Sequence, residues 1–214
     1  MIYGVDTSYA NGTCNWDQAA KDERVRWVYS RACYGSNPAD DDGATLIAAH
    51  DGCKRNGIPF SAYMFWLAWQ PGAEQAANFL DAANGVFGNN SPIVDVEEGS
   101  GLYGWGASLE ARIANLAACL NAIQAKLGQP IIYTNRDTWE TYFGGTDAFS
   151  GHRFISADYS SPAGSPVAIQ GVKNIVAQQF SDGSGQLPIQ GLSKPDNNVD
   201  RDVLIGNDLA VLLR

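Results

Sequence analysis

The segment Pro92-Ile93-Val94-Asp95-Val96-Glu97-Glu98-Gly99 joins a short apolar run to a cluster of acidic residues. Its Ile-Val-x-Val pattern predicts a buried strand. Because successive side chains of a strand point to opposite faces, Asp95 and Glu97 share one face and Glu98 lies on the other. Two residues of a strand span about 6.6 Å, so the two carboxyls on the shared face are close enough to affect each other's ionisation.

An acidic pair at the end of an apolar strand has two explanations. Burying a charge costs free energy unless the charge is paired or used in chemistry. When two acids interact, one keeps its proton through a raised pKa while the other stays ionised, which is what general-acid cleavage of a glycosidic bond requires. The alternative is a structural ion pair with Arg31 or Arg136, although few basic residues lie nearby in the sequence.

Strand and helix patterns alternate along the first part of the chain and then change. Strands are expected at 2–6, 25–32, 60–67, 93–97 and 130–135, and helices at 16–22, 44–56, 73–83, 108–126 and 138–143. Three further strands, expected at 154–159, 175–180 and 198–204, follow one another through loops. This order predicts an α/β fold in which eight strands form a TIM-like barrel whose last three strands are poor in helices. We expect one catalytic domain over residues 1–214.

The ends of the expected strands carry polar and aromatic residues. In barrels of this kind the active site lies at the C-terminal ends of the strands. The residues at those ends are Asp6, Arg31, Tyr63, Phe65, Asp95, Glu97, Tyr133, Asn135, Asp158, Tyr159, Gln179 and Asp200. Because they come from separate strands, we expect them to meet at one mouth of the barrel.

Several of these candidates also have ordinary structural explanations. Asp6 could cap a helix or pair with Arg31. Asp200 could be a solvated residue, because Asp196 and Asp202 crowd what reads as the same loop. Packing inside the barrel is the corresponding alternative for Tyr63, Phe65, Tyr133, Trp139, Asp158 and Gln179.

Composition narrows the classes of partner. The net charge of −9 and pI near 4.5 argue against binding of nucleic acid or of an anionic membrane surface. No apolar run approaches the roughly 20 residues of a membrane span. The chain enters a strand at once, with no basic start or apolar leader, so we expect a secreted protein whose leader was removed or one released without a leader.

The cysteines and histidines give no sign of a metal site. Cys14, Cys33, Cys53 and Cys119 form no CxxC pair, and the two histidines lie far apart in the sequence. We therefore expect no metal and no cofactor. The sequence leaves open whether the cysteines form disulfides or remain free thiols.

A series of short motifs, roughly one for each strand, occurs in a recognisable order. They are Tyr3-Gly4-Val5-Asp6, Tyr29-Ser30-Arg31-Ala32, Ala62-Tyr63-Met64-Phe65, Val94-Asp95-Val96-Glu97, 130–135 followed by Trp139, Ala157-Asp158-Tyr159, Gln178-Gln179-Phe180-Ser181 and Val199-Asp200. In this order they resemble the family 25 glycoside hydrolases, lysozymes that cleave bacterial peptidoglycan. The resemblance covers nearly the whole chain.

The resemblance implies a fold, an activity and a set of roles. The fold is a modified barrel of five β/α units followed by β-strands, and the activity is hydrolysis of the β-1,4 bond between N-acetylmuramic acid and N-acetylglucosamine. Glu97 would be the general acid, Asp95 its partner carboxylate, and Asp6 and Asp200 the supporting acids. The expected substrate-binding residues are Arg31, Tyr63, Phe65, Tyr133, Asn135, Trp139, Asp158 and Gln179.

Two reaction routes and three functions remain open at this point. Two carboxyls so close on one strand can hardly reach opposite faces of a sugar ring, which favours attack by the substrate's own N-acetyl group and retention of configuration. An inverting route would use Asp6 or Asp200 as the base. The expected partner is bacterial peptidoglycan, cleaved by a monomer that acts on the cell wall, as an endolysin or an antimicrobial lysozyme. The alternatives are a hydrolase of another N-acetylhexosamine polymer such as chitin, and a non-catalytic wall-binding module.

Overall fold

The computed structural model describes residues 1–40, 42–87, 90–97, 107–192 and 199–213. Within these residues, eight strands form a closed barrel whose order around the ring is the order of the chain. The strands are β1 (Tyr3–Thr7), β2 (Val28–Tyr34), β3 (Phe60–Phe65), β4 (Ile93–Val96), β5 (Ile131–Asn135), β6 (Phe154–Ala157), β7 (Ile175–Ser181) and β8 (Asp200–Leu204). The predicted TIM-like barrel is confirmed.

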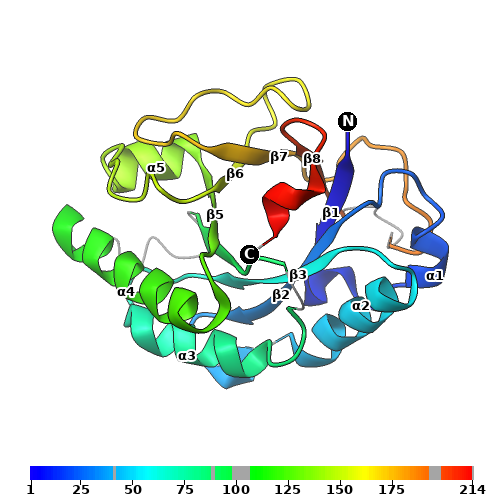
Figure 1. Ribbon diagram of the computed structural model, residues 1–214, viewed down its shortest axis with the longest axis horizontal. Helices are drawn as coiled ribbons and strands as arrows, with labels where there is room; N and C mark the ends of the chain where they lie inside the picture. Colours follow the sequence, from blue (N-terminus) through cyan, green and yellow to red (C-terminus); the bar gives the residue numbers. More distant parts are fainter. Residues whose placement is uncertain (41, 88–89, 98–106, 193–198, 214) are drawn as a thin grey trace.

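Each of the first five strands is followed by an α-helix. The helices are α1 (Trp16–Ala19), α2 (Gly43–Arg55), α3 (Gly72–Ala82), α4 (Leu109–Leu127) and α5 (Arg136–Tyr142), and the 3-10 turns are η1 (Tyr9–Asn11), η2 (Pro38–Asp40) and η3 (Leu209–Leu212). Figure 1 shows α2, α3 and α4 along one side of the barrel and long loops beside β6, β7 and β8. The helix-poor last part of the barrel is therefore as predicted.

Strand β8 differs from the other strands in direction. Neighbouring strands from β1 to β7 are parallel, whereas β8 runs antiparallel to both β7 and β1. This register sets Asp200 directly opposite Asp6. Asp200 and Asp202 therefore lie in a strand, as the pattern at 198–204 predicted, and the alternative that Asp200 lies in a solvated loop was wrong. Asp196 and Glu98, the other acids named from the sequence, lie outside the described residues.

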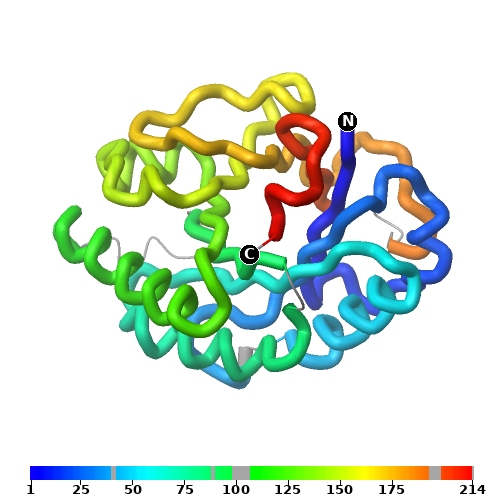
Figure 2. The backbone as a smooth tube through the Cα atoms, viewed as in Figure 1, coloured from blue at the N-terminus to red at the C-terminus, as the bar shows by residue number. Residues whose placement is uncertain are grey.

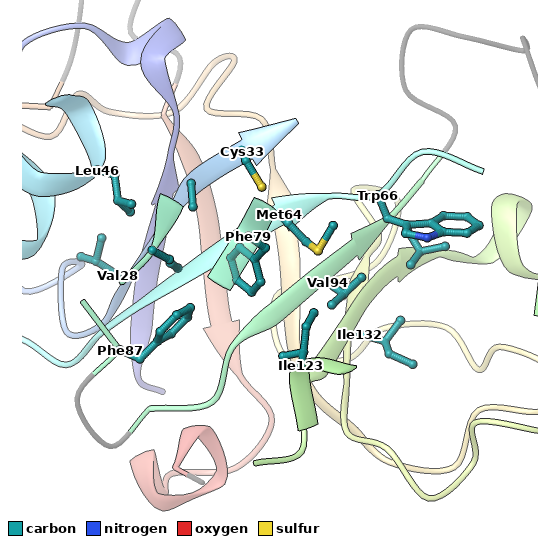
Figure 3. Packing of buried hydrophobic residues seen from close by; sticks show 14 of the residues in the cluster. Val28, Cys33, Leu46, Met64, Trp66, Phe79, Phe87, Val94, Ile123 and Ile132 are labelled. Carbon is teal, nitrogen blue, oxygen red and sulfur yellow. The ribbon is translucent and has the colours of Figure 1, made fainter. Parts of the chain in front are cut away.

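The barrel has an outer and an inner apolar layer because strand side chains alternate. Val94 and Val96 of β4 point outward, toward the helices. They pack in one cluster with the α4 residues Leu116, Leu120 and Ile123. Figure 3 shows this packing around Val28, Met64, Phe79, Val94 and Ile123. The inner layer contains Trp27, Tyr29, Tyr63, Ile93, Ile131, Tyr133, Ile155, Ala177, Leu204 and Leu212. The alternation on β4 turns Asp95 toward this interior.

The end of the barrel opposite the strand C-termini is closed by packing. The Trp27 indole lies across β1 at Gly4, where an added Cβ would come within 2.4 Å of the ring. The C-terminal segment returns to this end, as Figure 2 shows, and Leu212 joins the inner layer. The Leu212 carbonyl accepts from the Ser91 amide at 2.8 Å, and the Arg153 guanidinium donates to the carbonyls of Val211 and Leu213, each at 2.7 Å.

Local sequence signals fix the helix that follows the acidic strand. Ser108 caps α4 by accepting from the Ala111 amide at 3.2 Å, and Gly128 ends the helix with a φ of 77°. Because both ends are fixed, the apolar stripe of α4 faces the outer surface of the sheet. The acidic strand is thereby held between two packed layers.

Candidate active site

A cavity of about 100 Å³ opens at the C-terminal ends of the strands. Its lining consists of Asp6, Tyr29, Tyr63, Ile93, Asp95, Glu97, Tyr133, Tyr159, Gln179 and Asp200. The four carboxyls expected to be catalytic all line this cavity, although they come from three separate strands or strand ends. The structure thus brings together the acids that the sequence places far apart.

Asp95 and Glu97 form the acidic pair on the β4 side of the cavity. Asp95 is buried, and its Oδ1 atom contacts no hydrogen-bond donor among the described residues. Burial raises the pKa of Asp95 well above its ordinary value, and the charge of Glu97 raises it further. Burial also raises the pKa of Glu97. The pair therefore holds a proton at a pH where two solvent-exposed acids would both be ionised.

Asp6 and Asp200 form a second acidic pair on the β1–β8 side. Burial raises the pKa of Asp200 to about 9, and the charge of Asp6 adds to this effect. The hydrogen bond between the two side chains raises the pKa of Asp200 and lowers that of Asp6. Asp200 is therefore the donor in this pair and carries the shared proton.

Gln179 connects Asp6 to the aromatic wall. Its Nε2 atom donates to Asp6 Oδ2 at 2.8 Å, and its Oε1 atom accepts from the Tyr133 hydroxyl at 2.8 Å. The Tyr159 hydroxyl donates to the same Oε1 atom. Because two hydroxyl donors fix the orientation of the amide, Gln179 presents its N–H group to Asp6. Tyr63 completes this wall by packing edge-on against Tyr29, with ring centroids 5.6 Å apart.

Arg31 and Phe65 lie beside the cavity without lining it. The Arg31 guanidinium donates to Asp42 Oδ1 at 3.1 Å and lies 4.9 Å from the centre of the Tyr9 ring. Its positive charge lowers the pKa of Asp95. Phe65 stacks on Tyr34 with ring centroids 4.7 Å apart. Arg31 therefore acts on the acidic pair through its charge, and Phe65 packs against the neighbouring strand at Tyr34.

Asn135 and Asp158 line a wider depression of about 510 Å³ that also reaches Glu97. Asn135 caps α5 by accepting from the Thr138 amide at 2.8 Å. Burial alone would raise the pKa of Asp158, but hydrogen bonds from the Val167 amide and from Ser160 outweigh it and lower that pKa to about 2. Both side chains therefore hold the loops that shape this depression.

Trp139 is not part of the site. Its indole is fully buried, stacks on Phe143 with ring centroids 5.1 Å apart, and donates from Nε1 to the Thr146 carbonyl at 3.2 Å. The ring lies on the side of α5 that packs against the outer surface of the sheet, next to Phe154. The core-packing alternative describes this residue, and Trp139 leaves the expected substrate-binding set.

The sequence analysis missed Tyr29 and Asp202 as site residues and placed Tyr159 at the mouth without a role. Tyr29 and Tyr159 line the cavity, and Asp202 lies behind Asp6, where its Oδ1 atom accepts from the Tyr29 hydroxyl at 2.8 Å. Period-two alternation gives a signal for two of them, because Tyr29 is two residues from Arg31 and Asp202 is two residues from Asp200. Tyr159 is the last residue of the expected sixth strand and was expected at the mouth, but it was not assigned a role.

The described residues contain no group of three or more His, Cys, Asp or Glu side chains arranged to hold a metal ion. The structure records Cys14, Cys33, Cys53 and Cys119 as thiols and not as disulfides. No α-helix in the described part of the chain is long and apolar enough to span a membrane.

Comparison with solved structures shows the fold. The chain matches a bacterial lysozyme from Streptomyces coelicolor with a TM-score of 0.82 and 23% identity, over 99% of this chain and 95% of that one. A muramidase from Trichobolus zukalii matches with a TM-score of 0.79 and 22% identity, over 99% of each chain. A family GH25 lysozyme from Aspergillus fumigatus gives a TM-score of 0.78 and 21% identity, over 100% of this chain and 99% of that one.

The sequence itself carries the family assignment. Among curated proteins, a search found no match. The family described as glycosyl hydrolases family 25 matches residues 5–188, which include the acids of β1 and β4 and the glutamine of β7. The chain is a glycoside hydrolase and belongs to glycosyl hydrolases family 25.

Proposed function

We propose that the protein is an N-acetylmuramidase that hydrolyses the β-1,4 bond between N-acetylmuramic acid and N-acetylglucosamine in bacterial peptidoglycan. Membership of family 25 supports a glycosidase, and the similar structures include proteins described as lysozymes and muramidases. A cavity lined by acids and tyrosines fits this substrate class, because aromatic rings pack on sugars and paired carboxyls cleave glycosidic bonds.

One observation carries the proposal: the buried Oδ1 atom of Asp95 accepts no hydrogen bond from any group among the described residues. A buried acceptor without a donor costs about 1–3 kcal/mol, so it favours a ligand that supplies an N–H or O–H group. The acetamide of an N-acetylated sugar supplies such an N–H group. Its donation to Asp95 favours the ionised form of that carboxyl and leaves the proton of the pair on Glu97.

The spacing of the pair favours a substrate-assisted reaction. Asp95 and Glu97 are two residues apart on one side of the cavity, so neither can attack the sugar from the face opposite the other. The acetamide oxygen attacks the anomeric carbon, the glycosidic bond breaks, and Glu97 gives its proton to the leaving oxygen. Asp95 stabilises the positive charge that develops on the cyclised amide. Water then opens this intermediate as Glu97 takes back a proton, and the configuration is retained.

Asp6 and Asp200 have a supporting role in this route. They share a proton, and Gln179 holds Asp6 in place. A hydrogen-bonded pair that holds one proton can bind sugar hydroxyls while carrying one negative charge instead of two. In the inverting alternative, one of the two would instead remove a proton from water.

The decisive experiment compares digestion of purified peptidoglycan by the wild type and by Glu97→Gln, with the released ends identified by mass spectrometry. We expect new reducing N-acetylmuramic acid ends from the wild type and a loss of rate of about 100- to 10,000-fold in the variant. Glu110→Gln is the matched control, because this exposed glutamate lies on α4 away from the cavity.

The other outcomes separate the alternatives. NMR analysis of the first-formed anomer distinguishes the routes, and an inverted product would rule out substrate assistance. Cleavage of soluble chitin fragments without cleavage of peptidoglycan would move the proposal to another N-acetylhexosamine polymer. Binding of peptidoglycan by a folded wild type with no turnover would indicate a wall-binding module.

A further inference from the structure

A second cavity, of about 310 Å³, lies on the outer face of the barrel beside the loop that joins β7 to β8. Because Asp200 lines the catalytic cavity, strand alternation turns the next residue, Arg201, to the outer face. Among the described residues, none lines both cavities. The lining of the outer cavity consists of Tyr3, Gly4, Glu23, Arg24, Ala163, Phe180, Gln186, Arg201 and Asp202.

Arg201 is a buried cation in the wall of this outer cavity. Its side chain is 3% exposed, and its Nη2 atom donates to the Leu187 carbonyl at 3.1 Å. Its Nε and Nη1 atoms are buried and donate to no acceptor in the described part of the chain. A guanidinium keeps its charge and offers N–H groups in a planar fork that matches a carboxylate or a phosphate. The unused donors of Arg201 therefore favour an anionic ligand.

Arg24 brings a second guanidinium to the same point. Its Nη1 atom donates to the same Leu187 carbonyl at 2.9 Å, so the donating nitrogens of the two arginines lie within about 6 Å of each other. Asp22 accepts from Arg24 Nε at 2.8 Å, which offsets one of the two charges. Burial lowers the pKa of Arg201 to about 10, and the charge of Arg24 lowers it further. The second charge is therefore only partly compensated by the protein.

A structural explanation covers Arg24 but not Arg201. Arg24 also donates to the Pro188 carbonyl at 2.8 Å, so it holds the loop after β7 in place. This role does not use Nε and Nη1 of Arg201, and it does not require a cavity beside them. Two acids also line the cavity: Glu23 is exposed, and the Oδ1 atom of Asp202 accepts from the Tyr29 hydroxyl inside the barrel.

Aromatic rings form another part of the cavity wall. Tyr3 and Phe180 are half-buried and pack edge-on, with ring centroids 6.0 Å apart. Rings of this kind pack on the body of a sugar or polyol. We propose that the outer cavity binds an oxyanion, a phosphate or a carboxylate, carried on a sugar or polyol. Arg201 and Arg24 bind the oxyanion, and the two rings contact the body that carries it.

The test is titration of the protein with two probes, glycerol 3-phosphate and N-acetylmuramic acid, followed by calorimetry and by NMR of the Arg201 Nε–H signal. We expect a saturable shift of this signal with at least one probe, and the tighter probe identifies phosphate or carboxylate as the preferred group. Glycerol and N-acetylglucosamine are the uncharged counterparts and should leave the signal unchanged. The measurement needs no cleavage of glycan, so it is independent of the proposed function.

Three variants locate the binding. Arg24→Gln should raise the Kd about tenfold or more, because a hydrogen bond to a charged group is lost. Glu23→Gln should lower the Kd by about two- to fivefold, because a like charge leaves the edge of the cavity, and misfolding cannot produce such a gain. Arg55→Gln is the matched control, because this exposed arginine pairs with Asp17 and does not line the outer cavity.

Defined results would overturn the outer site. They are the absence of a saturable Arg201 shift with both charged probes, equal binding of the uncharged counterparts, or a Kd that Arg24→Gln and Glu23→Gln leave unchanged.

Discussion

The two acidic groups on opposite sides of the cavity differ in the hydrogen bonds that their carboxyl oxygens accept. On the β4 side, Asp95 has an oxygen that contacts no donor among the described residues. On the β1–β8 side, Asp6 is hydrogen-bonded to Gln179 and Asp200, and Asp202 is hydrogen-bonded to Tyr29. The difference indicates a division of labour, in which Asp95, with its unbonded oxygen in the cavity wall, awaits the substrate, and the hydrogen-bonded pair of Asp6 and Asp200 forms a fixed wall.

The largest effect is expected from Asp95→Asn, which removes the carboxylate on the β4 side of the cavity. The amide would present an N–H group or a weaker acceptor where the carboxylate stabilises developing positive charge. We expect kcat to fall by about 100- to 1000-fold while KM changes little, because the lost interaction forms mainly in the transition state. Steady-state kinetics on soluble peptidoglycan fragments measure both values.

The measured kcat and KM of Asp95→Asn could contradict this expectation. If kcat stays within a few-fold of the wild type, or if only KM rises, Asp95 contributes to binding alone. Asp81→Asn is a suitable control, because this exposed acid lies in α3 and lines neither the cavity nor the wider depression beside it.

An intermediate effect is expected from Asp200→Asn and concerns stability. The pKa of Asp200 is about 9 in the folded protein and about 3.9 in an unfolded chain. A raised folded-state pKa means that stability present below about pH 4 is lost as the pH rises toward 9. Asp200→Asn removes this loss, so its free energy of unfolding should exceed that of the wild type by about 1 kcal/mol or more at pH 8.

Denaturant unfolding at pH 4 and pH 8 would measure this dependence. The advantage of the variant should shrink at pH 4, where both forms of the protein hold the proton. An equal difference at the two pH values would show that Asp200 is not buried as a neutral acid.

The smallest effect is expected from Tyr133→Phe, which tests the hydrogen bonds that hold the β1–β8 side of the cavity. The variant removes one of two hydroxyls that donate to Gln179, and the Tyr159 hydroxyl remains. We expect a loss of about 1 kcal/mol in the free energy of unfolding and less than about tenfold in kcat. Thermal melting and kinetics check both values, and a hundredfold loss of kcat would mean that the Tyr133 hydroxyl contacts the reacting sugar.

The sequence predicted the barrel and the acidic strand because both depend on local signals. Strand alternation turned Asp95 and Glu97 to one face, and the order of strands and helices fixed the ring. What it missed depends on packing between distant segments. Trp139 was expected at the sugar, but its ring is held by Phe143 and Phe154 in the outer layer. Asp202 acquires its partners only when β8 lies beside β1.

The placement of β8 also has a consequence for the timing of synthesis. The site needs Asp6 from the first strand and Asp200 from the last, so the acidic wall cannot assemble while β8 is still missing from the growing chain. Chains emerge from the ribosome N-terminal end first, at about 5–20 residues per second. A nascent chain that already carries the β4 acids therefore lacks the opposite, acidic wall of the cavity until the last strand has emerged.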